Sequence, residues 1–244
     1  MFGSIKAVWA AVAGLALGMS LVAPACADVL SKTATIGGTT VNYKVVVPKD
    51  FDPAKTYPAI LAFPPGGQGM DLVDSTIAAN YRAEAERRGY IVIEPAAPGG
   101  VLFFEGGERI FPAFLTKLLA DYKIQDNKFN GAGVSNGGLS VFLIVSKYPQ
   151  YFLSVTGFPG FLDGGSPQQL AALGKLCIHM YAGELDSGWP DAEREQAAQF
   201  KTKGYNVTFS LEKGQGHVMR TLAGAGAARL FDQFDAARKG RCGN

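Results

Sequence analysis

The alternation of short apolar runs with amphipathic helical stretches constrains the fold of this chain more than any other feature of its sequence. Residues 33–36 and 41–47 alternate polar and apolar side chains, and Gly37-Gly38 between them indicates a hairpin turn. Beyond this hairpin, apolar runs typical of buried strands are separated by helical stretches, which is the order that builds a parallel sheet. The expected strands are residues 59–63, 90–94, 129–134, 152–158, 176–181 and 207–211, and the expected helices are residues 72–88, 109–122, 139–147, 192–203 and 221–239.

This order predicts an α/β fold in which a mostly parallel central sheet carries helices on both faces. We find no internal repeat, linker or low-complexity segment, so residues 28–244 are expected to form a single domain. No insertion is long enough for a large lid domain. The net charge of +2 is close to neutral and argues against a nucleic-acid partner. The sequence does not indicate an oligomeric state.

The N-terminal stretch has the pattern of a secretory signal peptide. Lys6 is followed by an apolar run over residues 7–22, and Ala25 and Ala27 fit an A-x-A cleavage site. We therefore expect residues 1–27 to be removed and the remaining chain to be secreted or periplasmic, with no membrane attachment after cleavage. Two alternatives are an uncleaved membrane anchor and a lipoprotein signal that ends at Cys26.

The chain has three cysteines, and Cys26 lies within the predicted signal peptide. Export makes a disulfide between Cys177 and Cys242 permissible, and a buried free thiol at Cys177 is the alternative. Neither residue has metal-ligand spacing with other Cys or His residues. The sequence therefore predicts no metal site and no cofactor.

The segment 133–138, Gly-Val-Ser-Asn-Gly-Gly, lies between an expected strand and an expected helix. This context is the one that a G-x-S-x-G nucleophile turn requires, because the sharp turn exposes the serine hydroxyl and crowds the neighbouring backbone. Gly133 and Gly137 supply the clearance. Ser135 is therefore the candidate nucleophile, and a Gly/Ser-rich turn without chemistry is the alternative.

A serine nucleophile needs a general base, and the chain contains two histidines. His217 lies in a glycine-rich loop after an expected strand, whereas His179 lies inside one, so His217 is the candidate base. The acid that orients the imidazole is expected in a loop between the serine and the histidine. Asp186 is the candidate, with Glu184 as its rival; Asp163 and Asp191 do not directly follow a strand.

The negative charge that develops in acyl transfer needs backbone N–H donors. The amide of Asn136, directly after the serine, is one candidate. Pro64 and Pro65 lack an N–H, so Gly66 is the first available donor after the strand at 59–63. The candidate substrate-binding residues are Trp189, Gly67 and Gln68.

These segments resemble the α/β-hydrolase superfamily, in particular the secreted esterase branch that includes polyhydroxybutyrate depolymerase-like and feruloyl-esterase-like proteins. The resemblance rests on residues 57–68, 122–128, 133–138, 183–186 and 216–217. It departs from the family at Pro64-Pro65, where a His-Gly pair is usual. The resemblance implies an α/β-hydrolase fold and an esterase that acts on a small-molecule or polymeric ester, and it does not identify the ester.

Two other functions remain open at this stage. A peptidase of the prolyl-oligopeptidase type shares the fold and the order of serine, acid and histidine, although such enzymes carry an additional domain. A catalytically inactive exported binding protein keeps the fold but does not need all three residues. An acyltransferase is a further possibility.

Overall fold

The computed structural model describes Met1 and residues 27–242. The predicted signal peptide falls almost wholly outside these residues, so it stays a prediction. Within the described residues, no helix is both long and apolar enough to span a membrane.

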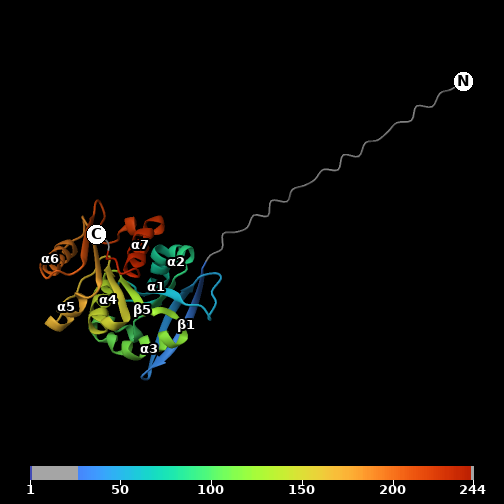
Figure 1. Ribbon diagram of the computed structural model, residues 1–244, viewed down its shortest axis with the longest axis horizontal. Coiled ribbons are helices and arrows are strands. Elements are labelled where there is room, and N and C mark those ends of the chain that lie inside the picture. Colours follow the sequence, from blue (N-terminus) through green and yellow to red (C-terminus); the bar gives the residue numbers. More distant parts are fainter. Residues whose placement is uncertain (2–26, 243–244) are drawn as a thin grey trace.

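An eight-stranded sheet forms the centre of the molecule, in the order β1-β2-β4-β3-β5-β6-β7-β8 (Figure 1). Strands β1 and β2 form an antiparallel hairpin, and β2 also pairs antiparallel with β4. All other neighbours are parallel, as the sequence predicts. The strands are β1 (Asp28–Ile36), β2 (Thr39–Val47), β3 (Tyr57–Phe63), β4 (Ile91–Pro95), β5 (Ile124–Gly133), β6 (Phe152–Gly157), β7 (Cys177–Gly183) and β8 (Val207–Glu212).

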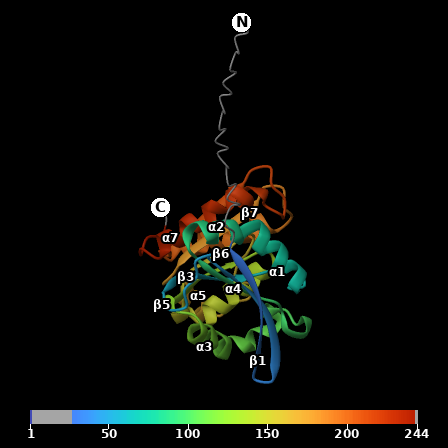
Figure 2. The same ribbon diagram turned by 90° about the vertical axis from the view of Figure 1, so that its right-hand side faces the viewer.

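Helices cover both faces of this sheet (Figure 2). One apolar cluster packs α1 (Met70–Thr76), α2 (Arg82–Arg88) and α7 (Ala228–Ala237) against one face. A second cluster packs four helices against the other face. They are α3 (Phe111–Asp121), α4 (Asn136–Lys147), α5 (Pro167–Leu173) and α6 (Trp189–Thr202). Strands β3, β4 and β7 have no exposed residue because helices cover both sides of them.

Three helices differ from the expectation. The helix predicted over residues 72–88 is α1 and α2 joined by a π-helical turn, η1 (Ile77–Tyr81). The helix predicted over residues 221–239 begins with two 3-10 turns, and regular α-helix starts only at Ala228. Helix α5 was not predicted, although the capping box of Ser166 and Gln169 is a sequence signal that marks its start.

A disulfide joins Cys177, the first residue of β7, to Cys242 in the C-terminal tail. This settles the alternative that the sequence left open between a bridge and a free thiol. The tail that follows α7 is therefore fastened to the sheet at the amino end of β7. The candidate site residues lie at the opposite end, because the loops that carry them follow the carboxyl ends of β3, β5, β7 and β8.

Candidate active site

Ser135 occupies a tight turn between β5 and α4. Its backbone has φ 56° and ψ −119°, a conformation that residues with a side chain rarely adopt. The turn fits only because the residues two positions before and two positions after Ser135 are glycines. A Cβ on Gly137 would lie 2.1 Å from the carbonyl oxygen of Phe63, and one on Gly133 would lie 2.1 Å from that of Gly137. The sequence therefore forces the serine out of the sheet and into a loop position.

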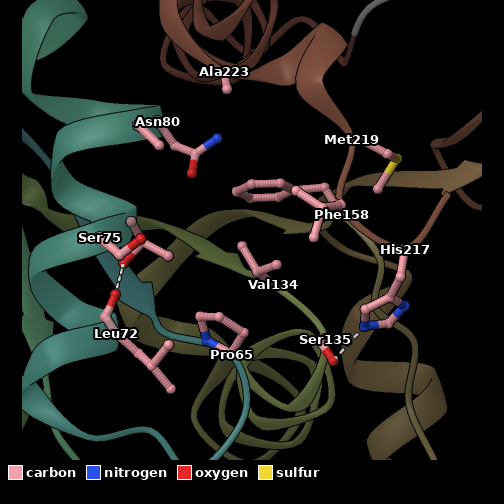
Figure 3. Close-up of a pocket in the computed structure, with 13 residues that line it drawn as sticks. Pro65, Leu72, Ser75, Asn80, Val134, Ser135, Phe158, His217, Met219 and Ala223 are labelled. Atoms are coloured by element: carbon pink, nitrogen blue, oxygen red, sulfur yellow. Dashed lines mark hydrogen bonds between the residues drawn. The ribbon is translucent and has the colours of Figure 1, made fainter. Parts of the chain in front are cut away.

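His217 contacts both other candidate catalytic residues. Its Nε2 lies 2.8 Å from Ser135 Oγ, and its Nδ1 lies 2.7 Å from Asp186 Oδ2 (Figure 3 shows the serine contact). When Nδ1–H donates to the carboxylate, Nε2 is free to accept the serine proton. The Asp186 side chain is 7% exposed and also accepts the amide of Ser187, whereas the imidazole is 39% exposed. The three residues predicted from sequence thus lie within hydrogen-bond distance of one another in series.

The loop that carries His217 is held by Glu212, the last residue of β8. The Glu212 carboxylate accepts both terminal nitrogens of Arg229 and the hydroxyls of Thr221 and Ser210. These contacts, led by Arg229, lower the pKa of Glu212 to about 2. The carboxylate is therefore ionised at neutral pH and anchors both ends of the loop.

Glu184, the rival candidate for the acid, has a different position. Its carboxylate accepts the amide of Gly214, and its own amide donates to the carbonyl of Glu212. It contacts the backbone of the histidine-bearing loop, whereas Asp186 contacts the imidazole itself.

His179 lies in the sheet, as its position within a strand predicts. It is almost fully buried, and its Nδ1 lies 2.9 Å from the hydroxyl of Thr208. Burial lowers the pKa of His179 to about 4, so the ring is neutral at pH 7. The structure brings His217, and not His179, to the serine.

The two candidate oxyanion donors are joined by a hydrogen bond. The Asn136 side-chain amide donates to the carbonyl of Gly66 at 2.9 Å. Gly66 has φ 56°, in the left-handed region that favours glycine. Within the described part of the chain, the backbone amides of Asn136 and Gly66 have no hydrogen-bond acceptor. Both are therefore available to a ligand, and their role as oxyanion donors stays a prediction.

The candidate substrate-binding residues are placed differently from one another. Gln68 is fully buried, where its side chain donates to Ser140 Oγ at 2.9 Å and accepts the amide of Phe103 at 2.9 Å. It anchors the loop after β3, so its side chain is used inside the protein. Gly67 is exposed on the same loop. The Trp189 ring lies 5.3 Å from the His217 ring and 5.5 Å from that of Phe161, at the edge of the candidate site.

A pocket of about 280 Å³ opens beside Ser135 and His217. In Figure 3, residues of α1 and η1 line one side of it and the segment after His217 lines the other. Most of its wall is apolar, and Ser75, Thr76 and Asn80 contribute polar groups. Sequence analysis missed this wall, since the spacing of residues 72–80 indicates only an amphipathic helix. The remaining lining residues are Pro65, Leu72, Ala79, Val134, Phe158, Val218, Met219 and Ala223.

Nothing in the described residues gathers three His, Cys, Asp or Glu side chains in a way that could hold a metal ion. The polar groups that the candidate site brings together are the Ser135 hydroxyl, the His217 imidazole and the Asp186 carboxylate, beside the backbone amides of Asn136 and Gly66.

Comparisons with known proteins identify the fold. No family model matches the chain. A curated relative, dipeptidyl-peptidase 5 of Porphyromonas gingivalis, is 29% identical over 151 residues, which are 57% of this chain and 22% of the relative. The chain thus spans less than a quarter of that protein.

Solved structures of esterases resemble this one. A thermostable esterase superposes with a TM-score of 0.61 at 20% identity, covering 77% of this chain and 55% of its own. A ferulic acid esterase superposes with a TM-score of 0.63 at 16% identity, covering 87% and 98%. Such similarity shows the fold: the chain has the α/β-hydrolase fold predicted from its sequence, and no large lid is evident in the described residues.

Proposed function

We propose that this protein is an exported serine hydrolase that cleaves carboxylic esters through an acyl-enzyme intermediate. The observation that carries the proposal is the hydrogen-bonded series Ser135–His217–Asp186, with the serine in a backbone conformation that exposes its hydroxyl. The similarity to esterases supports the class of reaction. The signal-like N-terminus and the disulfide support export.

The reaction follows from the order of contacts. The Ser135 hydroxyl attacks the ester carbonyl carbon as His217 Nε2 takes its proton, and Asp186 stabilises the imidazolium. The amides of Asn136 and Gly66 donate to the oxyanion of the tetrahedral intermediate. When the carbon–oxygen bond breaks, the imidazolium protonates the leaving alcohol and the acyl group remains on Ser135. A water molecule, deprotonated by His217, then attacks the acyl carbon, the bond from that carbon to Ser135 Oγ breaks, and the imidazolium returns the proton to Oγ as the acid leaves.

The pocket beside Ser135 supports the proposal that the substrate is an ester with an apolar part. Leu72, Val134, Phe158 and Met219 form an apolar wall, and an apolar part of the ester that binds against this wall is removed from water. The Trp189 ring beside His217 and the exposed Gly67 on the loop after β3 are candidates to contact an aromatic or polymeric ester.

The test is hydrolysis of p-nitrophenyl butyrate by the wild-type protein and by Ser135→Ala, with fluorophosphonate labelling of both. We expect Ser135→Ala to lose labelling and to lower kcat by roughly 10³-fold or more, because the other groups act through the nucleophile. Ser31→Ala is the matched control, since Ser31 is exposed on β1. A folded wild-type protein that neither turns over nor labels would instead favour the binding protein.

A peptidase is the second candidate, because the curated relative is named a dipeptidyl-peptidase. Both reactions use the same serine, so labelling does not separate them. Peptide p-nitroanilides do, because a peptidase cleaves their amide bond and an esterase leaves it intact. Sustained turnover of the anilides, lost in Ser135→Ala, would replace the esterase proposal.

A further inference from the structure

Glu193 is a buried acidic side chain that the reaction described above does not use. It lies on α6 and is fully buried, although its neighbours Arg194 and Glu195 are exposed. Its Oε1 accepts the amide hydrogen of Gly160 at 2.7 Å, and its Oε2 has no partner among the described residues. Because burying a carboxyl group is unfavourable unless it forms hydrogen bonds, the contact with Gly160 is the one that stabilises it there.

Gly160 belongs to a segment that supports the nucleophile turn. This segment, residues 158–160, follows β6. The carbonyl of Pro159 accepts the amide of Ser135 at 2.8 Å, and the amide of Phe158 donates to the carbonyl of Gly133 at 3.0 Å. Phe158 also lines the pocket beside the serine (Figure 3). The segment therefore holds the backbone of Ser135 and forms part of the pocket wall.

The backbone of this segment is in close contact with the start of α4. A Cβ on Gly138 would lie 2.1 Å from the carbonyl oxygen of Pro159, and a Cβ on Gly160 would lie 2.6 Å from the Cα of Gly138. Since no side chain separates the two backbones, a shift of Gly160 moves the Ser135 turn directly.

We propose that Glu193 is a positioning residue for Ser135: by accepting the Gly160 amide, it fixes the Pro159 carbonyl that in turn holds the serine backbone. The inference rests on the proposed function of Ser135 as nucleophile. Ser135 has a positive φ, and such a conformation persists only where surrounding contacts enforce it. Glu193 supplies one of these contacts from a helix that is distant in sequence.

The protonation of Glu193 fits this role. Burial, together with the negative charge of nearby Asp186, raises the pKa of Glu193 to about 9. The carboxyl group is therefore neutral at pH 7 and adds no charge beside the Asp186–His217 pair. Its carbonyl oxygen is a neutral acceptor, so the amide oxygen of a glutamine can replace it.

Gln196 provides a matched control on the same helix. It accepts the amide of Leu162 at 2.9 Å and donates to the carbonyl of Leu162 at 2.8 Å. Gln196 thus holds the same loop at Leu162, two residues after Gly160. It does not contact the Pro159–Gly160 peptide, whose carbonyl accepts the Ser135 amide.

The test compares Glu193→Gln, Glu193→Met and Gln196→Met. We expect Glu193→Met to lower kcat by about 10-fold or more with KM within about two-fold, because a displaced nucleophile slows chemistry more than binding. Glu193→Gln should stay within about two-fold of the wild type, since it keeps the acceptor. Hydrogen exchange at Ser135 should accelerate in the Met variant and not in the Gln variant. Gln196→Met should change neither readout at Ser135.

Three outcomes would overturn the proposal: wild-type kcat in a folded Glu193→Met, equal damage in Glu193→Gln, or unchanged exchange at Ser135. If Glu193→Met does not fold, Glu193→Asp replaces it, because the shorter carboxyl keeps its polarity but does not reach Gly160. A wild-type protein without turnover or labelling would reject the proposed function. An active wild type with insensitive variants would reject the role of Glu193 alone.

Discussion

The nucleophile turn, residues 133–138, and the histidine loop, residues 213–219, meet at the same hydrogen bond but are held by different interactions. Glycine contacts with the backbone of neighbouring segments hold the nucleophile turn. The histidine loop also meets the backbone of Gly183 and Leu185, and side chains hold it in addition: Glu212 binds Arg229 and Thr221, and Glu184 accepts the amide of Gly214.

The difference determines how each region responds to change. Close backbone contact leaves no space for an added atom, so a small substitution in the nucleophile turn requires the sheet and α4 to move. Polar side-chain contacts are individually weaker and can be lost one at a time. We therefore expect a single substitution in the nucleophile turn to cause a large loss of stability. Single substitutions in the histidine loop should each cause a small loss.

The largest difference is expected between two glycine-to-alanine variants, one in the nucleophile turn and one in the histidine loop. In Gly137→Ala the new Cβ would lie 2.1 Å from the Phe63 carbonyl oxygen, whereas in Gly216→Ala it would meet nothing within 4 Å. We expect Gly137→Ala to lose more than about 4 kcal/mol of unfolding free energy, and Gly216→Ala to stay within about 0.5 kcal/mol. Urea unfolding followed by circular dichroism measures both, and similar values for the two variants would remove the distinction.

An intermediate effect is expected from Arg229→Met, which leaves the Glu212 carboxylate without its cation. The Glu212 side chain is 6% exposed, but Arg229 is 45% exposed and partly screened by solvent. We expect a loss of about 2 kcal/mol at pH 7. Arg194→Met, which removes an exposed pair with Asp191, is the control and should change stability little.

Arg229→Met also tests how the stability contributed by the Glu212–Arg229 pair depends on pH. Because Arg229 lowers the pKa of Glu212 to about 2 from its ordinary 4.5, the pair stabilises the fold fully above pH 4.5 and progressively less as the pH falls toward 2. The difference in unfolding free energy between wild type and Arg229→Met should therefore shrink between pH 4.5 and 2. A difference that stays constant over this range would contradict the ion pair as its source.

The smallest effect is expected from Gln215→Ala in the histidine loop. Its side-chain oxygen accepts the amide of Arg220 at 2.9 Å near the surface. We expect a loss below about 1 kcal/mol and a change in kcat of a few-fold, since Glu212 and Glu184 still hold the loop. Lys213→Ala, at an exposed neighbouring position, is the control. A loss of kcat as large as that of Ser135→Ala would show that the loop also fails completely.

Sequence periodicity was sufficient to predict all eight strands and a mostly parallel α/β sheet, because apolar runs bounded by glycine and proline are local signals. The α/β-hydrolase fold itself was implied by the family resemblance. It did not reveal the π-helical turn at Ile77–Tyr81, whose spacing matches an uninterrupted helix. That turn belongs to the wall of the pocket, so its geometry matters for the candidate site and was not accessible from spacing alone.

In the candidate site, too, the sequence predicted the place of some residues and misjudged that of others. Ser135, Asp186 and His217 were predicted because each follows a strand, and the carboxyl ends of parallel strands share one edge of a sheet; their catalytic role stays a prediction. Gln68 was expected at the substrate but is an internal anchor, because its partners Ser140 and Phe103 come from distant segments.

By itself, the sequence determined the order of the strands, most of the helices between them, the tight glycine turn at Ser135 and the loops in which Asp186 and His217 lie. These properties depend on neighbouring residues along the chain. Only the tertiary structure decided that Glu212 pairs with Arg229, that Glu193 is buried against Gly160, and that Cys177 joins Cys242. The physical reason is that burial and hydrogen-bond partners arise from segments that meet only when the sheet and its helices assemble.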